Sequence, residues 1–153
     1  MKKTLTALMI GLSCFVSSVA HADTQTPVQV AAFKIGNGNY SVNGYTFKDV
    51  APYIKNDRTY LPLRFAAYAC GIGDNNIYWD GANQKVYLQK GDKIIIVTIG
   101  SNTMQVGDQT ITLDAPAEIT NGRTMLPISY IAKAFGCDVK WDGDKQIVTI
   151  IAH

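Results

Sequence analysis

The chain has 153 residues, of which 47% are hydrophobic and 17% are charged, and its formal net charge is +2. A chain of this length can form one compact domain or two very small ones. The charge excess comes from Lys2 and Lys3 at the start, and the other 12 basic residues balance the 12 acidic ones. This balance lacks the basic patch of nucleic-acid-binding proteins, so we expect no nucleic acid among the partners.

The N-terminus has the pattern of a secretory signal peptide. Two lysines precede the mostly apolar stretch 5–20, and Ala20-His21-Ala22 supplies small residues at the −3 and −1 positions of a cleavage site. We predict a signal peptide over residues 1–22, cleaved before Asp23, and export to the periplasm, the cell surface or the medium. No later segment is long and apolar enough to predict a membrane span.

After a short polar leader, residues 23–27, the chain repeats itself. The segment NDRTYLP, Asn56 to Pro62, recurs 65 residues later as NGRTMLP, Asn121 to Pro127. Similar matches on both sides of this segment use up the remaining chain. We therefore predict two tandem copies, residues 28–91 and 92–153.

Each copy is predicted to place several strands around one short helix. Asn43-Gly44 is the residue pair that favours a type I′ hairpin turn, because both central residues need positive φ. The helix is expected to begin at Pro62 or Pro127, where a missing N–H costs nothing. It is expected to end at Gly71 or Gly136, where glycine provides a left-handed cap.

Hairpins are predicted after each helix, with Trp79 and Trp141 just ahead of Asp-Gly turns. A tight turn at Lys90–Lys93 then connects the copies and leads into the apolar run Ile94–Val97. Such a run predicts a strand that is buried on both faces. The short connection predicts one α+β body made of two β-rich units, each holding one helix.

Two cysteines follow the predicted signal peptide, and export would permit a disulfide between Cys70 and Cys137. Cys70 occupies the helical position that Phe135 occupies in the second copy. It is therefore expected to face the core. The sequence leaves open whether the two residues are bridged or are separate buried thiols.

The long ordered motif resembles the copper amine oxidase N-terminal-like domain, also called the stalk domain, and the resemblance covers both copies. It implies a twisted antiparallel sheet wrapped around a helix, in exported bacterial envelope proteins, with neither the copper nor the catalytic quinone of the amine oxidases. The second copy has Ser129 where the first keeps the usual Arg64. The positions that carry the resemblance are Arg58, Thr59, Pro62, Gly71 and Trp79, and then Arg123, Thr124, Pro127, Gly136 and Trp141.

Side chains suited to catalysis or metal binding are scarce. His21 belongs to the predicted signal peptide, and the only other histidine, His153, ends the chain. Glu118 is the single glutamate, and Asp142-Gly143-Asp144 lacks the other ligands of a calcium loop. We therefore expect no enzyme, no cofactor and no metal site.

The paired arginines of the repeated motif have two interpretations. Arg58 and Arg123 would stabilise the fold by bridging to carbonyl or carboxylate groups between layers, or they would hold an anionic ligand. Thr59 and Thr124 suit strand entry or hydroxyl hydrogen bonds near the helix start. Because both copies carry the pair inside a fold-defining motif, the structural interpretation is favoured.

Seven of the eight tyrosines lie in the first copy. Tyr40 and Tyr60 correspond to methionines in the second copy and are expected in the core. Four others correspond to polar residues and are expected to be exposed, where they would suit stacking on sugars or anchoring a protein. The alternative is that these tyrosines are buried against the second copy or the leader. These four are Tyr45, Tyr68, Tyr78 and Tyr87.

Two functions fit these observations. The first is an exported, non-catalytic envelope module that binds a wall glycan or another envelope protein through exposed tyrosines. The second is a structural subunit that forms oligomers. In this case residues 24–30, which comprise most of the leader and the start of the first copy, would add a strand to a neighbour's sheet.

Overall fold

The computed structural model describes residues 28–153. The predicted signal peptide, residues 1–22, and the predicted leader, residues 23–27, lie outside the described residues. The first half of the described chain contains β1 (Gln29–Lys34), β2 (Asn39–Val42), β3 (Tyr45–Lys48), β4 (Tyr53–Lys55), β5 (Arg58–Pro62), α1 (Leu63–Ala69), the 3₁₀ helix η1 (Asp74–Asn76), β6 (Ile77–Asp80) and β7 (Lys85–Lys90).

The second half repeats this order of elements, apart from the 3₁₀ helix. It contains β8 (Lys93–Thr98), β9 (Thr103–Val106), β10 (Gln109–Thr112), β11 (Glu118–Thr120), β12 (Arg123–Pro127), α2 (Ile128–Phe135), β13 (Asp138–Asp142) and β14 (Ile147–Ala152).

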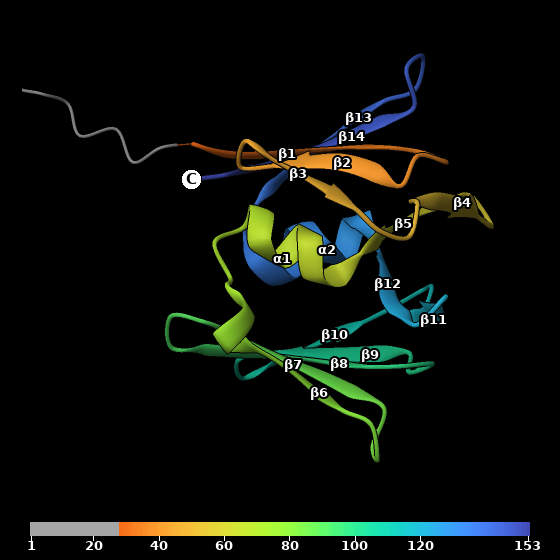
Figure 1. The fold of residues 1–153 in the computed structure, drawn as a ribbon. Coiled ribbons are helices and arrows are strands. Elements are labelled where there is room, and N and C mark those ends of the chain that lie inside the picture. The colour runs from red at the N-terminus through yellow and green to blue at the C-terminus, as the bar shows by residue number, and fades with distance from the viewer. Residues whose placement is uncertain (1–27) are drawn as a thin grey trace, which may run out of the picture.

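Two five-stranded antiparallel sheets enclose the helices (Figure 1). The upper sheet has the strand order β13-β14-β1-β2-β3, and the lower sheet has the order β10-β9-β8-β7-β6. A four-stranded side sheet, β11-β12-β5-β4, lies beside the helices. Antiparallel sheets with two short helices confirm the α+β class.

The two halves are interlaced. The upper sheet takes three strands from the first half and two from the second, and the lower sheet does the reverse. In the side sheet β5 pairs with β12, with Leu61 opposite Leu126. Two separate units, each with a sheet around its own helix, are therefore not shown, because each large sheet needs strands from both halves.

Local sequence signals account for the turns and the helix ends. Asn43 and Gly44 have φ angles of 51° and 83°, as the predicted type I′ turn requires. The helices begin one residue after Pro62 and Pro127, and α2 ends before Gly136, whose φ is 66°. The predicted helix starts are thus correct to within one residue.

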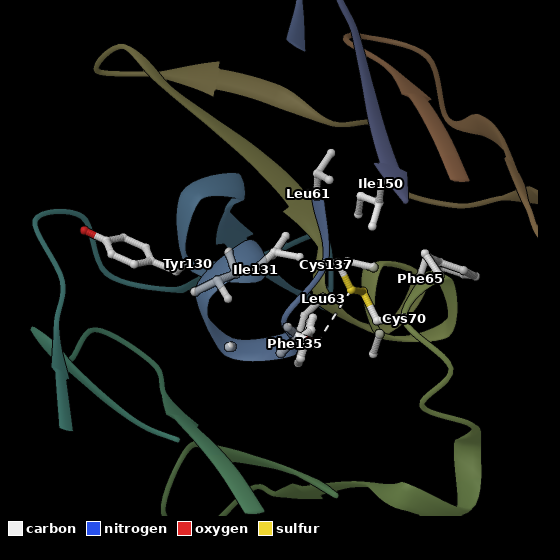
Figure 2. Packing of buried hydrophobic residues seen from close by; sticks show 14 of the residues in the cluster. Leu61, Leu63, Phe65, Cys70, Tyr130, Ile131, Phe135, Cys137 and Ile150 are labelled. Atoms are coloured by element: carbon white, nitrogen blue, oxygen red, sulfur yellow. Dashed lines mark hydrogen bonds between the residues drawn. A yellow bond between two sulfur atoms is a disulfide. The ribbon is translucent and has the colours of Figure 1, made fainter. Parts of the chain in front are cut away.

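A single apolar core runs through the layers. Figure 2 shows part of it, with Cys70 at the end of α1 joined to Cys137, which precedes β13. Cys70 is buried, as its helical position predicts, and Cys137 is buried as well. Their Cα atoms are 6.4 Å apart. The disulfide connects the two halves through the core.

The prediction for Ile94–Val97 was wrong. Ile95 and Val97 are fully buried, but Ile94 is 52% exposed and Ile96 is half-buried. The lower sheet is an outer layer, so its strands are covered only on the side that faces the helices. The apolar run of β8 therefore places isoleucines on an open face.

Within residues 28–153, none of the helices is long and apolar enough to cross a membrane.

Candidate functional site

The two arginines of the repeated motif form reciprocal ion pairs between the halves. Arg58 Nη2 donates to Asp114 Oδ2, and Arg123 Nε donates to both carboxylate oxygens of Asp49, at 2.8 and 3.0 Å. Burial opposes ionisation of Asp49, but hydrogen bonds from Arg123 and the Val50 amide outweigh it and lower the pKa of this carboxyl. These contacts support the structural interpretation of the arginines.

Most other motif positions build the junction between a strand and its helix. Thr59 and Thr124 lie in β5 and β12, and the buried Pro62 and Pro127 end these strands where the helices begin. Gly71 has a φ of 80° after the C-cap of α1. These residues therefore position elements rather than a ligand.

The two tryptophans behave differently from the rest of the motif. Trp79 and Trp141 lie on β6 and β13, which are edge strands of the lower and upper sheets. Trp79 remains 40% exposed, although Val86, its neighbour across the ladder, is buried. An indole that is half open to solvent at a sheet edge is available for binding.

The structure brings together two of the four predicted binding tyrosines. Tyr78 and Tyr87 are cross-strand neighbours on β6 and β7, with ring centroids 6.2 Å apart. Tyr45 lies on β3 in the upper sheet, and Tyr68 packs its ring edge-on against Phe65 in α1. The four tyrosines therefore do not share one face.

The Tyr78–Tyr87 pair belongs to a row of residues that crosses the outer face of the lower sheet. Tyr78, 66% exposed, pairs with Tyr87, which in turn pairs with Ile96. Ile94 extends the apolar surface along β8. We call Tyr78, Tyr87, Ile94 and Ile96 the outer strip. The row continues through Gln105 and Thr110, so its apolar character ends at β9.

A cleft of about 440 Å³ lies on the other side of β6. Its walls come from β6 and β7, from the start of α1, and from the β11–β12 hairpin of the side sheet. From the sequence, Trp79 and Arg123 were assigned to the positions that carry the family resemblance. The cleft was not predicted, because it forms between two sheets. The side chains that define its chemistry are Leu63, Arg64, Ile77, Trp79, Ile119 and Arg123.

A smaller cavity of about 240 Å³ lies near Lys55 and Glu118, whose side chains form an ion pair at 2.7 Å. Glu118 also accepts a hydrogen bond from the Tyr53 hydroxyl. Burial opposes ionisation of Glu118, but the Lys55 and Tyr53 hydrogen bonds outweigh it and lower the pKa of this carboxyl. A carboxylate held in its ionised form by a cation is a poor general acid.

Among the described residues, no group of three or more histidine, cysteine, aspartate or glutamate side chains has the arrangement that a metal ion requires. The Asp142-Gly143-Asp144 segment forms a turn in which Asp142 Oδ1 accepts hydrogen bonds from the amides of Asp144 and Lys145. That carboxylate is used by the turn itself.

Comparison with known proteins identifies one family. The family model for the copper amine oxidase N-terminal domain matches residues 37–150. Searches of curated proteins and of solved structures each return no match. The domain that defines this family is a non-catalytic, stalk-like module. Because the match covers most of the sequence, the chain belongs to the copper amine oxidase N-terminal domain family.

Proposed function

We propose that the protein is an exported, non-catalytic module of the cell envelope that binds another envelope protein or a wall glycan through the outer strip. The non-catalytic character of the family supports the absence of a reaction. The signal-peptide pattern at residues 1–22 supports export. Binding is supported by the outward-facing row in which Tyr78 is 66% exposed and its neighbours Tyr87 and Ile96 are half-buried.

The chemistry of the outer strip suits a flat partner. Tyrosine rings offer rigid apolar area with a polar tip, and they are enriched among residues that dominate binding energy. Ile94 and Ile96 add aliphatic area next to the rings. Because the strip lies on the open face of a sheet rather than in a cavity, a protein surface fits it better than a small molecule.

Strand addition in an envelope assembly is a second candidate, because β3, β6, β10 and β13 are edge strands of the large sheets. The structure restricts which segment could be donated. Gln29 and Val30, which were predicted to belong to a donating leader, already pair with β14 as part of β1. Donation would therefore involve residues that precede Gln29.

The outer strip is tested by co-sedimentation of the purified protein with isolated cell walls, before and after protease treatment of the walls. The double variant Tyr78→Ser/Tyr87→Ser is expected to lose binding and to keep its melting temperature within a few degrees, because both side chains lie on an outer face. Tyr45→Ser is the matched control, since Tyr45 is 73% exposed on the other large sheet.

The outcomes separate the partners and the two candidate functions. Binding that survives protease treatment indicates a glycan, and binding that is lost indicates a protein. Equal binding by the double variant and the wild type contradicts a role for the outer strip. Light scattering on the same samples reports oligomers, and assemblies that disappear when residues 23–28 are deleted would favour strand addition. Mass spectrometry of the secreted chain checks cleavage before Asp23.

A further inference from the structure

The cleft beside β6 is a second surface, separate from the outer strip. Successive side chains of a strand point to opposite faces, so Trp79 faces the cleft while Tyr78 belongs to the outer strip. The volume of about 440 Å³ falls within the usual range of small-ligand sites. A ligand in the cleft would therefore leave the outer strip free.

Apolar side chains form one part of the cleft. Trp79 lines the cleft together with Ile77, Leu63 and Ile119, which come from three different elements. An indole face presents a flat apolar platform with a negative quadrupole. Such a platform suits the C–H face of a sugar ring.

Two cations line the cleft, and their acidic partners lie outside its lining. Arg64 Nη1 is 3.3 Å from Asp74 Oδ1 in an exposed ion pair, which contributes little and competes weakly with a ligand. Arg64 comes from α1 and Arg123 from β12. Among the described residues, the hydrogen bonds that Arg123 makes to Asp49 use only Nε, which leaves both Nη groups for a ligand. Guanidinium groups bind carboxylates in a fixed planar geometry.

The corresponding positions around Trp141 have different charges. Ser129 replaces Arg64, and Asp57 replaces Gly122. The first set therefore has two arginines and no acid among the lining positions, and the acidic partners of these arginines lie outside that lining. The second set has one arginine, Arg58, together with Asp57. The repeated motif folds with serine in place of Arg64 in the second half, so the fold does not require both arginines. The combination of Arg64 and Arg123 occurs only at the Trp79 cleft.

We propose that the Trp79 cleft binds a carboxylate-bearing sugar unit of an acidic glycan. The sugar ring stacks on the Trp79 indole, and its carboxylate accepts hydrogen bonds from the guanidinium groups of Arg64 and Arg123. The apolar walls contact the rest of the ring. Charge complementarity selects the acidic sugar over a neutral one.

The experiment uses the Trp141→Phe variant of the whole exported chain, in which Trp79 is the only tryptophan. The probe is a trimer of galacturonic acid, and its fully methyl-esterified form is the neutral control. We expect the acid to change the tryptophan fluorescence saturably. The ester is expected to bind about tenfold more weakly, because it cannot form the charge-assisted hydrogen bonds.

Arg64→Ser gives the first half the residue found in the second, and it is expected to weaken binding of the acid about tenfold. The reverse exchange, Asp57→Gly with Ser129→Arg in the wild-type background, is the control in the other half. It is expected to leave the stoichiometry measured by calorimetry at one, because Arg58, unlike Arg123, already uses an Nη group to bind an aspartate. Asp57 has a φ of 59°, so glycine fits that turn, and Ser129 is exposed.

Three results would overturn the assignment. The first is the absence of a saturable response to the acid at millimolar concentration. The second is equal affinity for the acid and its ester. The third is unchanged affinity in a folded Arg64→Ser protein. Binding of a peptide through its terminal carboxylate, with no binding of the sugar acid, would assign the cleft to a peptide. Tyr78→Ser/Tyr87→Ser is expected to leave sugar binding unchanged, which distinguishes this site from the outer strip.

Discussion

The outer faces of the two large sheets occupy equivalent places in the fold but differ in chemistry. Across the lower sheet the outward row begins with Tyr78, Tyr87 and Ile96. Across the upper sheet the corresponding row reads Lys140, Thr149, Ala32, Ser41 and Thr46. The same backbone pairing thus accepts either aromatic or polar outward residues.

The inward faces do not show this freedom. Leu88 and Ile150 are corresponding residues of β7 and β14, and both are fully buried. Met104 and Tyr40, from β9 and β2, are likewise buried. Folding therefore demands apolar residues only on the side that faces the helices, and the aromatic character of the outer strip is not needed for folding.

Removing the disulfide that joins the halves is expected to destabilise the protein most. The double variant Cys70→Ser/Cys137→Ser removes a disulfide between two residues that are 67 positions apart in the sequence. The lost restraint on the unfolded chain, in the chain-entropy description, is expected to lower the free energy of unfolding by about 4 kcal/mol. Urea unfolding measures this. The expectation would be contradicted if the wild type and the double variant had the same unfolding midpoint and if reductant did not shift the midpoint of the wild type.

Substitutions at two neighbouring residues of β7 compare the inner and outer faces of the lower sheet. Leu88→Ala removes a fully buried side chain and is expected to cost about 3 kcal/mol, because it leaves a cavity in the core. Tyr87→Ala, one residue away on the outer face, is expected to cost less than about 1 kcal/mol. Thermal and urea unfolding provide the comparison. Similar losses for both variants would mean that the outer strip is part of the fold.

Exchanging the outward residues of the two large sheets tests whether the aromatic residues are needed for binding. Tyr78→Lys with Tyr87→Thr gives the lower sheet the side chains of the upper one. We expect a fully folded protein whose binding to cell walls is at least about tenfold weaker, because aromatic anchors are lost. The control exchanges Lys140→Tyr and Thr149→Tyr, which leaves the outer strip intact. Circular dichroism and co-sedimentation measure the two properties, and undiminished binding would argue against a role for the aromatic residues.

The smallest expected effect concerns the ion pair between Asp49 and Arg123. The folded state lowers the pKa of Asp49, so the pair stabilises the protein above the unfolded carboxyl pKa of about 4. The stabilisation is lost as the pH falls through the lower folded value. Because Arg123 is half exposed, the contribution is expected to be about 1 kcal/mol or less.

Asp49→Asn tests this pair. Its free energy of unfolding is expected to lie below that of the wild type at pH 7 and to approach it in acid. A difference that stays constant from pH 7 to about pH 2 would show that Asp49 stabilises the fold by some other means than its charge.

Signals that act over a few residues were readable from the sequence. The Asn43-Gly44 turn, the helix starts after Pro62 and Pro127, and the burial of Cys70 all follow from local geometry. Each depends on a preferred φ angle, a missing N–H or a 3.6-residue period. Such preferences need no knowledge of distant strands.

Features that depend on distant pairing were not readable. The isoleucines of β8 resemble a strand covered on both sides, and periodicity alone does not say which face receives a second layer. Only the register placed Tyr78 beside Tyr87 and left Tyr45 on another sheet. The Trp79 cleft depends on two sheets meeting, so no single segment indicated it.

The interlaced sheets have a consequence for how the chain reaches its final form. Among the strands of residues 28–153, β1 is the first and β14 the last, and they are hydrogen-bonded neighbours in the upper sheet. The upper sheet therefore closes only when the final residues arrive, and contacts this far apart in sequence make folding slow. A chain truncated before Ile147 would expose a long open edge on β1 and invite aggregation. A single cut at Gly91, by contrast, is expected to leave two fragments that stay together, because strands of both halves pair in every sheet.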